Sequence, residues 1–127
     1  LFPYTTLFRL YLPDFGYSNS EIEIICGLIV ATKIPQSPKT KLEQIIADAD
    51  LAYLGFRGAH SKAKLLFKEM QCLNPTLSEE EFIDIQISFL QNHNYFTAYC
   101  QNKTTLGKLE YLKSLMNKIP SYKLALK

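Results

Sequence analysis

The 127-residue sequence has no tryptophan, only three cysteines and no large excess of charge of either sign. Its 14 basic and 12 acidic residues leave a net charge of +2, and the lysines form no run, so no nucleic-acid partner is predicted. Cys26, Cys72 and Cys100 are widely spaced and include no Cys-x-x-Cys pair. They therefore predict neither a disulfide framework nor a structural zinc site, and are typical of a reducing compartment such as the cytoplasm.

Long hydrophobic runs and nucleotide-binding motifs are also missing. The longest apolar run, residues 22–34, is interrupted by polar residues and is shorter than the roughly 20 residues that a membrane span requires. There is no Gly-rich phosphate loop, no nucleophile elbow and no Cys/His pair at a useful spacing, so no catalytic residue is predicted from such motifs. The length and the 47% hydrophobic content fit one domain with one core.

What the sequence does contain is helical patterning, which predicts an all-α bundle of about five helices. Two Ser-x-x-Glu pairs, Ser18 with Glu21 and Ser78 with Glu81, have the spacing of a capping box at a helix start. They predict a largely buried helix over residues 19–32 and another that begins near residue 79 and ends near residues 92–94. A further helix is expected over residues 61–73, closed by an Asn-Pro pair.

The helix expected over residues 39–54 carries two carboxylates. Ser37 is its expected cap, Pro38 can open it at its first position, and Gly55 is expected to end it in the left-handed conformation. Helical spacing predicts one buried apolar face made of Leu42, Ile45, Ile46, Ala49, Ala52 and Tyr53. Asp48 and Asp50 flank that face on opposite edges, so only one of them can belong to a given site.

Residues 45–55, which read Ile-Ile-Ala-Asp-Ala-Asp-Leu-Ala-Tyr-Leu-Gly, and the later segment 89–97 resemble the C-terminal half of the HD-domain metal-dependent phosphohydrolases. In that superfamily a helical bundle holds one or two divalent metal ions through an early His, a His-Asp pair and a later Asp. This resemblance implies an incomplete HD-domain-like bundle and places the later Asp at Asp50, with Asp48 as the alternative. For the intact relative it implies a divalent metal (Mn, Mg, Fe, Co, Ni or Zn) and a phosphorylated small molecule or nucleotide as substrate.

The rest of the HD ligand set does not match. Neither His60 nor His93 is followed by Asp, and both come after the Asp pair. The chain alone is therefore expected to bind no metal and to lack activity. Its first nine residues resemble the translation of a sequencing adaptor, which would stand in place of the N-terminal half. The alternative is a genuine apolar strand or arm. We accordingly expect a non-native segment at 1–9, a partial HD-type domain at 10–120 and a tail at 121–127, with Pro120 ending the last helix.

The remaining polar residues have ordinary structural interpretations. His93 is expected at a helix end in a structural role, and His60 in a solvated loop. Lys62, Lys64 and Lys68 could contact a phosphate, although a solvated helix face is the better interpretation. An apolar stripe on the last helix is formed by Leu106, Leu109, Leu112, Leu115, Met116 and Ile119. It supports an alternative function, a helical protein-interaction module that docks a partner helix.

If the N-terminal helices of an HD bundle are missing, the helices at 19–32 and 39–54 lose their cover. We predict that the isolated chain is poorly folded or self-associating, because apolar patches larger than a few hundred Å² (about 300–600 Å²) favour association. Thermal unfolding followed by circular dichroism at several protein concentrations tests this. A sharp two-state transition that does not depend on concentration would contradict it.

Overall fold

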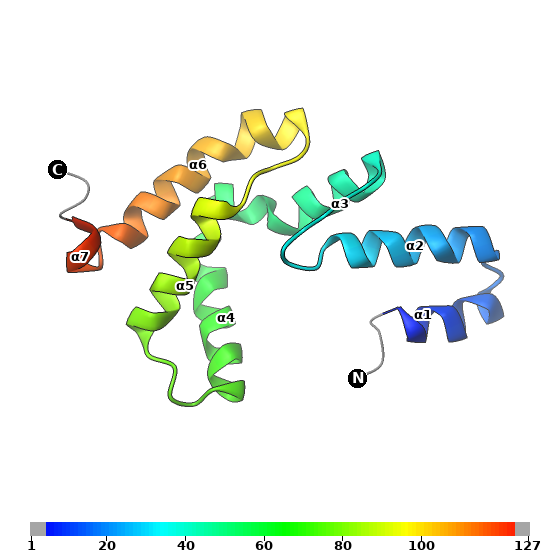
Figure 1. Ribbon diagram of the computed structural model, residues 1–127, viewed down its shortest axis with the longest axis horizontal. Helices are drawn as coiled ribbons and strands as arrows, with labels where there is room; N and C mark the ends of the chain where they lie inside the picture. Colours follow the sequence, from blue (N-terminus) through cyan, green and yellow to red (C-terminus); the bar gives the residue numbers. More distant parts are fainter. Residues whose placement is uncertain (1–4, 124–127) are drawn as a thin grey trace. The chain divides into compact units, whose positions relative to one another are not determined.

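The computed structural model describes residues 5–123, and every regular element in this range is helical. The elements are α1 (Thr6–Tyr11), the 3-10 helix η1 (Leu12–Phe15), α2 (Asn19–Ala31), α3 (Lys41–Leu51), the 3-10 helix η2 (Ala52–Gly55), α4 (Ala59–Leu73), α5 (Glu79–Asn92), α6 (Ala98–Met116) and α7 (Pro120–Lys123) (Figure 1). The all-α prediction is thus confirmed for this range. The chain forms two compact units, one up to Leu51 and one from Ala52. None of the described helices is long and apolar enough to cross a bilayer.

Two helices begin at the predicted capping boxes. At the start of α2 the backbone N–H of Ser18 donates to the Glu21 carboxylate at 2.8 Å, and the Ser18 hydroxyl accepts from the backbone of Glu21. Ser78 and Glu81 repeat this arrangement at the start of α5. The hydrogen bond from the Ser18 side chain, and to a smaller extent the one from its backbone N–H, hold the pKa of Glu21 below its ordinary value. Both caps depend on local sequence alone, which is why they were predictable.

The start of α3 differs from the prediction. The cap is Thr40 rather than Ser37: the Thr40 hydroxyl accepts from the backbone N–H of Glu43 at 3.2 Å. The Glu43 carboxylate in turn accepts from the backbone N–H groups of Thr40 and Lys39. Thr-x-x-Glu has the capping-box spacing too. The helix therefore begins at Lys41, three residues after the proline that was expected to open it.

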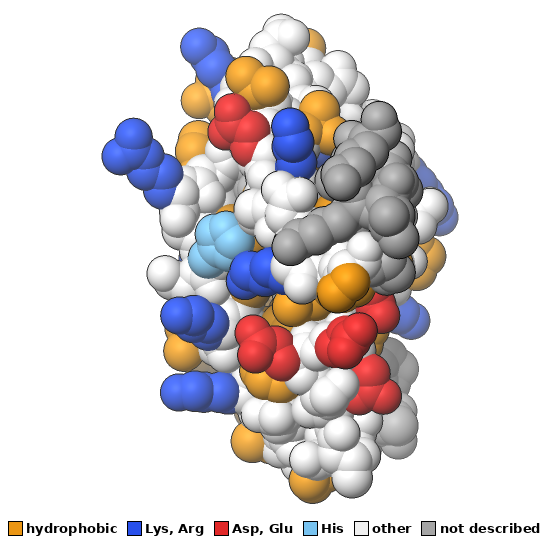
Figure 2. Space-filling view, turned by 90° about the vertical axis from the view of Figure 1, so that its left-hand side faces the viewer, with side chains coloured by type: hydrophobic (Ala, Val, Ile, Leu, Met, Phe, Trp, Pro, Cys, Tyr) orange, Lys and Arg blue, Asp and Glu red, His pale blue; other side chains and the backbone are white. Residues whose placement is uncertain are grey.

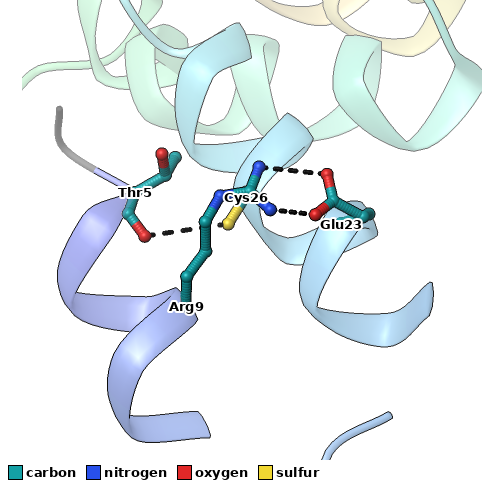
Figure 3. Close-up of polar contacts among 4 residues, drawn as sticks. All are labelled: Thr5, Arg9, Glu23 and Cys26. Carbon is teal, nitrogen blue, oxygen red and sulfur yellow. Dashed lines mark hydrogen bonds and ion pairs between the residues drawn. The ribbon is translucent and has the colours of Figure 1, made fainter. Parts of the chain in front are cut away.

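In the first unit α1 packs on α2. Figure 3 shows the Arg9 guanidinium of α1 paired through both terminal nitrogens with the Glu23 carboxylate of α2, with Nη2 3.0 Å from Oε2. Beside it the Cys26 thiol lies 4.0 Å from the carbonyl oxygen of Thr5. The ion pair is exposed and contributes at most about 1 kcal/mol.

The described part of the adaptor-like segment is helical, which excludes the strand alternative there. Its first four residues lie outside the described range.

The buried side of α3 is not the predicted apolar face. Ala47, Asp48 and Leu51 are buried, whereas Leu42 and Ile45 are 57% and 49% exposed. The prediction of one buried face centred on Leu42 and Ile45 is wrong, because α3 packs on α2 through its other side. On α2 itself Ile22 and Cys26 are buried but Ile24 and Val30 are exposed. The predicted burial of that helix on most sides is also wrong.

The second unit is built on a backbone contact between η2 and α6. A Cβ placed on Gly107 would overlap the carbonyl oxygen of Gly55, and one placed on Gly55 would lie 2.6 Å from the Cβ of Thr104. Gly55 does not adopt the predicted left-handed conformation, which among the described glycines occurs only at Gly16. The reason for glycine at 55 and 107 is therefore close approach rather than a positive φ.

The buried side of α6 also differs from the predicted stripe. Its buried residues are Cys100, Thr104, Lys108, Tyr111 and Leu115. Leu115 and Ile119 are buried as expected, but Leu106 and Leu109 are 69% and 50% exposed. The contact with η2 decides this, since it brings the Thr104 and Gly107 side of the helix inward.

The start of α4 and the end of α6 also differ from the prediction. α4 begins at Ala59, so His60 lies in a helix rather than a loop. Helix α6 ends at Met116, and Pro120 is the first residue of the short α7 rather than the end of a helix. Residues 121–123 of the expected tail are therefore helical, and the rest of that tail lies outside the described range.

The glycine contact predicts a specific sensitivity. Replacing Gly107 with Ala should destabilise the protein by about 1–3 kcal/mol, because the added methyl forces η2 and α6 apart, even though Ala is the better helix former. Gly58→Ala is the matched control, since no heavy atom lies within 4 Å of its added Cβ and its φ is −80°. Urea unfolding of both variants measures the difference. Equal midpoints would show that the contact is not tight.

Candidate functional site

The two predicted metal ligands lie on different sides of α3. Asp48 is 1% exposed and lies between Ala47 and Leu51 on the buried side, whereas Asp50 is exposed. The carbonyl of Ala47, the residue before Asp48, accepts a hydrogen bond from the Gln36 side chain at 2.9 Å, which connects the preceding loop to this helix. As expected from their spacing, the two carboxylates do not share a face. Only Asp48 is directed away from solvent.

The donor set does not fit a metal ion by itself. In the part of the chain that the structure describes, no three His, Cys, Asp or Glu side chains are close enough together to hold one. A transition-metal site of mixed chemistry requires imidazole as well as carboxylate ligands. His60 and His93 both belong to the second unit and are engaged in the contacts described next.

His93 lies at the C-terminal end of α5, as predicted, and is buried. Its ring stacks on Phe89 and meets Tyr95 edge to face, with centroids 5.5 and 4.7 Å apart. Its carbonyl oxygen accepts a hydrogen bond from the ammonium group of Lys108 on α6. Burial lowers the pKa of Lys108. This arrangement caps the end of α5 with a cation, where the helix dipole favours positive charge.

His60 is exposed, as expected, although it lies in a helix and its ring also contacts α6. Its Nε2 lies 3.2 Å from the Ser114 hydroxyl, and its ring meets Tyr111 edge to face at 4.7 Å. Burial lowers the pKa of His60, and the charges of Lys118 and Lys64 lower it further. Tyr111 donates to the side-chain oxygen of Gln86 at 2.5 Å, and burial raises its pKa to about 12.

A pocket of about 250 Å³ opens beside this histidine. Its lining includes Gly55, Arg57, His60, Gly107, Glu110 and Ser114. Sequence reasoning missed this group because its members are separated by about 50 residues and share no motif. The only local signals were the two glycines, whose role depends on a contact between distant segments. The lysines at 62, 64 and 68 are exposed, as the solvated-face interpretation predicted.

Comparison of the chain with known proteins identifies no relative. No protein-family model, no curated protein and no solved structure matches this chain.

The cap on α5 leads to a prediction for Lys108. Lys108→Met should destabilise the protein by about 1–3 kcal/mol, because the buried carbonyl of His93 loses its donor. Lys103→Met, at an exposed position of the same helix, is the control and should change stability by less than about 0.5 kcal/mol. Chemical unfolding followed at 222 nm measures both. If the two variants are equally stable, Lys108 does not serve as a cap.

Proposed function

We propose that this chain contributes one carboxylate ligand to the metal site of an HD-type phosphohydrolase, and that the histidine ligands come from residues outside it. The reaction is hydrolysis of a phosphoester, with a phosphorylated small molecule or a nucleotide as substrate. We expect the chain alone to be inactive, since the donors among residues 5–123 do not complete a site.

The observation that carries this proposal is the burial of Asp48. The Asp48 carboxylate is 1% exposed and so lies on the interior side of α3, which is the side from which a helix of a bundle contributes a metal ligand. The Asp-Ala-Asp segment is also the part of the sequence on which the resemblance to the HD superfamily rests.

Burial favours one of the two candidate ligands. Alignment of the short segment favours Asp50, but Asp50 is exposed and Asp48 is not. A metal ligand in a helical bundle is directed into the bundle. Asp48 is therefore the preferred ligand in this proposal, and Asp50 the alternative.

A second observation supports a larger bundle around α3. Leu42, Ile45 and Ile46 are exposed on one side of this helix, while Ala47 and Leu51 are buried on the other. A helix that is apolar on both sides is typical of the interior of a larger protein. The exposed side of α3 fits further helices packed on it, as an intact HD bundle would provide.

The test compares this chain with the protein encoded by the full reading frame at its source locus. The sequence upstream of the codon for Leu10 should encode, in frame, a His and then a His-Asp pair. The longer protein should hydrolyse p-nitrophenyl phosphate with Mn²⁺ present, and the 127-residue chain should not.

In the longer protein, Asp48→Asn should weaken Mn²⁺ binding at least as much as the roughly 10–100-fold loss that follows removal of an outer-shell partner. Asp84→Asn, at an exposed position of α5, is the matched control and should leave Mn²⁺ binding unchanged. Loss of binding in Asp50→Asn instead would reverse the assignment of the ligand. An upstream sequence without the histidines would contradict the proposal as a whole.

A second candidate function is a helical interaction module. Tyr99, Leu106 and Leu109 are exposed on α6 and recur at helical spacing, so they offer an apolar face to a partner helix. A defined dimer of the 127-residue chain, fully helical and indifferent to metal, would favour this function over the first.

A further inference from the structure

The pocket beside His60 is lined in part by the two glycines of the η2–α6 contact, which have no side chains to fill it. Gly55 and Gly107 contribute bare backbone to its lining, and Arg57, Glu110 and Ser114 contribute polar groups. Its volume of about 250 Å³ is slightly below the roughly 300–1,000 Å³ of sites that hold drug-sized ligands. It therefore suits a small metabolite. The pocket belongs wholly to the second unit, and nothing about it depends on the Asp-Ala-Asp segment of α3.

The hydrogen bonds around Ser114 fix the state of the His60 ring. The single hydroxyl proton of Ser114 is donated to the carbonyl oxygen of Tyr111 at 2.6 Å. His60 Nε2, 3.2 Å away, must then be the donor to the Ser114 oxygen. The neutral ring thus carries its proton on Nε2, and Nδ1 is the nitrogen that gains a proton when the ring becomes charged.

The charges around the ring are predominantly positive. Lys64 of α4 and Lys118, which follows α6, both act on His60, and Arg57 lines the same pocket. The acidic groups are Glu110 in the pocket wall and Glu79 of α5, which borders the adjoining cavity. Figure 2 shows one face of the molecule, on which Lys and Arg side chains lie near a histidine and acidic side chains lie above and below them. Arg57 and Glu110 balance each other in the pocket wall, and Lys64 and Lys118 beside the adjoining cavity outnumber Glu79, so three positive against two negative charges leave a net charge of +1 that favours an anion.

We propose that this pocket binds a small phosphomonoester, with Arg57 and His60 beside the phosphate and Glu110 accepting from a hydroxyl or amino group of the same molecule. The planar guanidinium of Arg57 matches two phosphate oxygens at once. The imidazole of His60, held by Ser114 through Nε2, supplies a second donor at Nδ1 once the ring takes up a proton.

This assignment has a direct electrostatic consequence. A phosphate dianion near His60 favours the charged imidazole and raises its pKa, opposing the effects of burial, Lys118 and Lys64. Binding should accordingly strengthen as the pH falls from 8 toward 6.5. It should weaken again below about pH 6, where the phosphate group itself takes up a second proton.

The experiment uses the 127-residue chain and inorganic phosphate as the probe. The imidazole C2–H resonance of His60, identified by its absence in His60→Gln, is titrated against pH in phosphate and in sodium chloride of equal ionic strength. Phosphate should raise the pKa of His60 by about one unit, and chloride should not. Arg57→Ala should abolish most of this shift. Lys68→Ala, which removes an exposed lysine of α4 outside the pocket, should leave it intact.

Several outcomes would overturn the assignment. These are an equal shift in chloride, which would indicate ionic strength alone, an unchanged shift in Arg57→Ala, or no shift at all. Arg57 is exposed, so this variant should keep the helical content of the parent, which circular dichroism checks. Histidine resonances at random-coil positions in the parent chain would also overturn it, since the pocket would then not exist. None of these measurements involves a divalent metal, so the outcome is independent of the phosphohydrolase proposal.

Discussion

Contact between the backbones of η2 and α6 is the constraint on which the second unit depends. Gly55 and Gly107 meet there with no room for a side chain, and Thr104 is buried beside them. This contact sets which side of α6 faces inward and so places Lys108, Tyr111 and Leu115 in the interior. Without it, the apolar stripe that includes Leu106 would be the natural packing surface of the helix.

The same contact positions the polar groups of the second unit. α4 starts shortly after η2, so the approach of η2 to α6 brings His60 to Tyr111 and Ser114. One turn earlier on α6, Lys108 reaches back to the carbonyl of His93 and closes the end of α5. The pocket with Arg57, His60 and Glu110 and the capped end of α5 therefore both depend on the contact between Gly55 and Gly107.

The first unit follows a different rule, because α3 has apolar residues on both sides. One side of α3 packs on α2. Asp48 is buried on that side, while Leu42 and Ile45 remain exposed. α3 thus carries a buried carboxylate on one side and an exposed apolar surface on the other. This combination gives the phosphohydrolase proposal its physical basis, and it would also be expected of a chain that associates with itself.

The sequence by itself determined the features that depend on neighbouring residues. The helical class and the starts of α2 and α5 follow from spacings of three or four residues, and the cap of α3 at Thr40 was equally readable, although Ser37 and Pro38 offered a competing start. The buried sides of α3 and α6, the helical placement of His60, and the pocket with Arg57 and Ser114 were decided only by the tertiary structure. Periodicity shows which residues of a helix could be buried, but a helix with apolar residues around much of its circumference has several candidate sides. The choice among them is made by contacts between segments about 50 residues apart, such as Gly55 with Gly107, for which a single sequence carries no local signal.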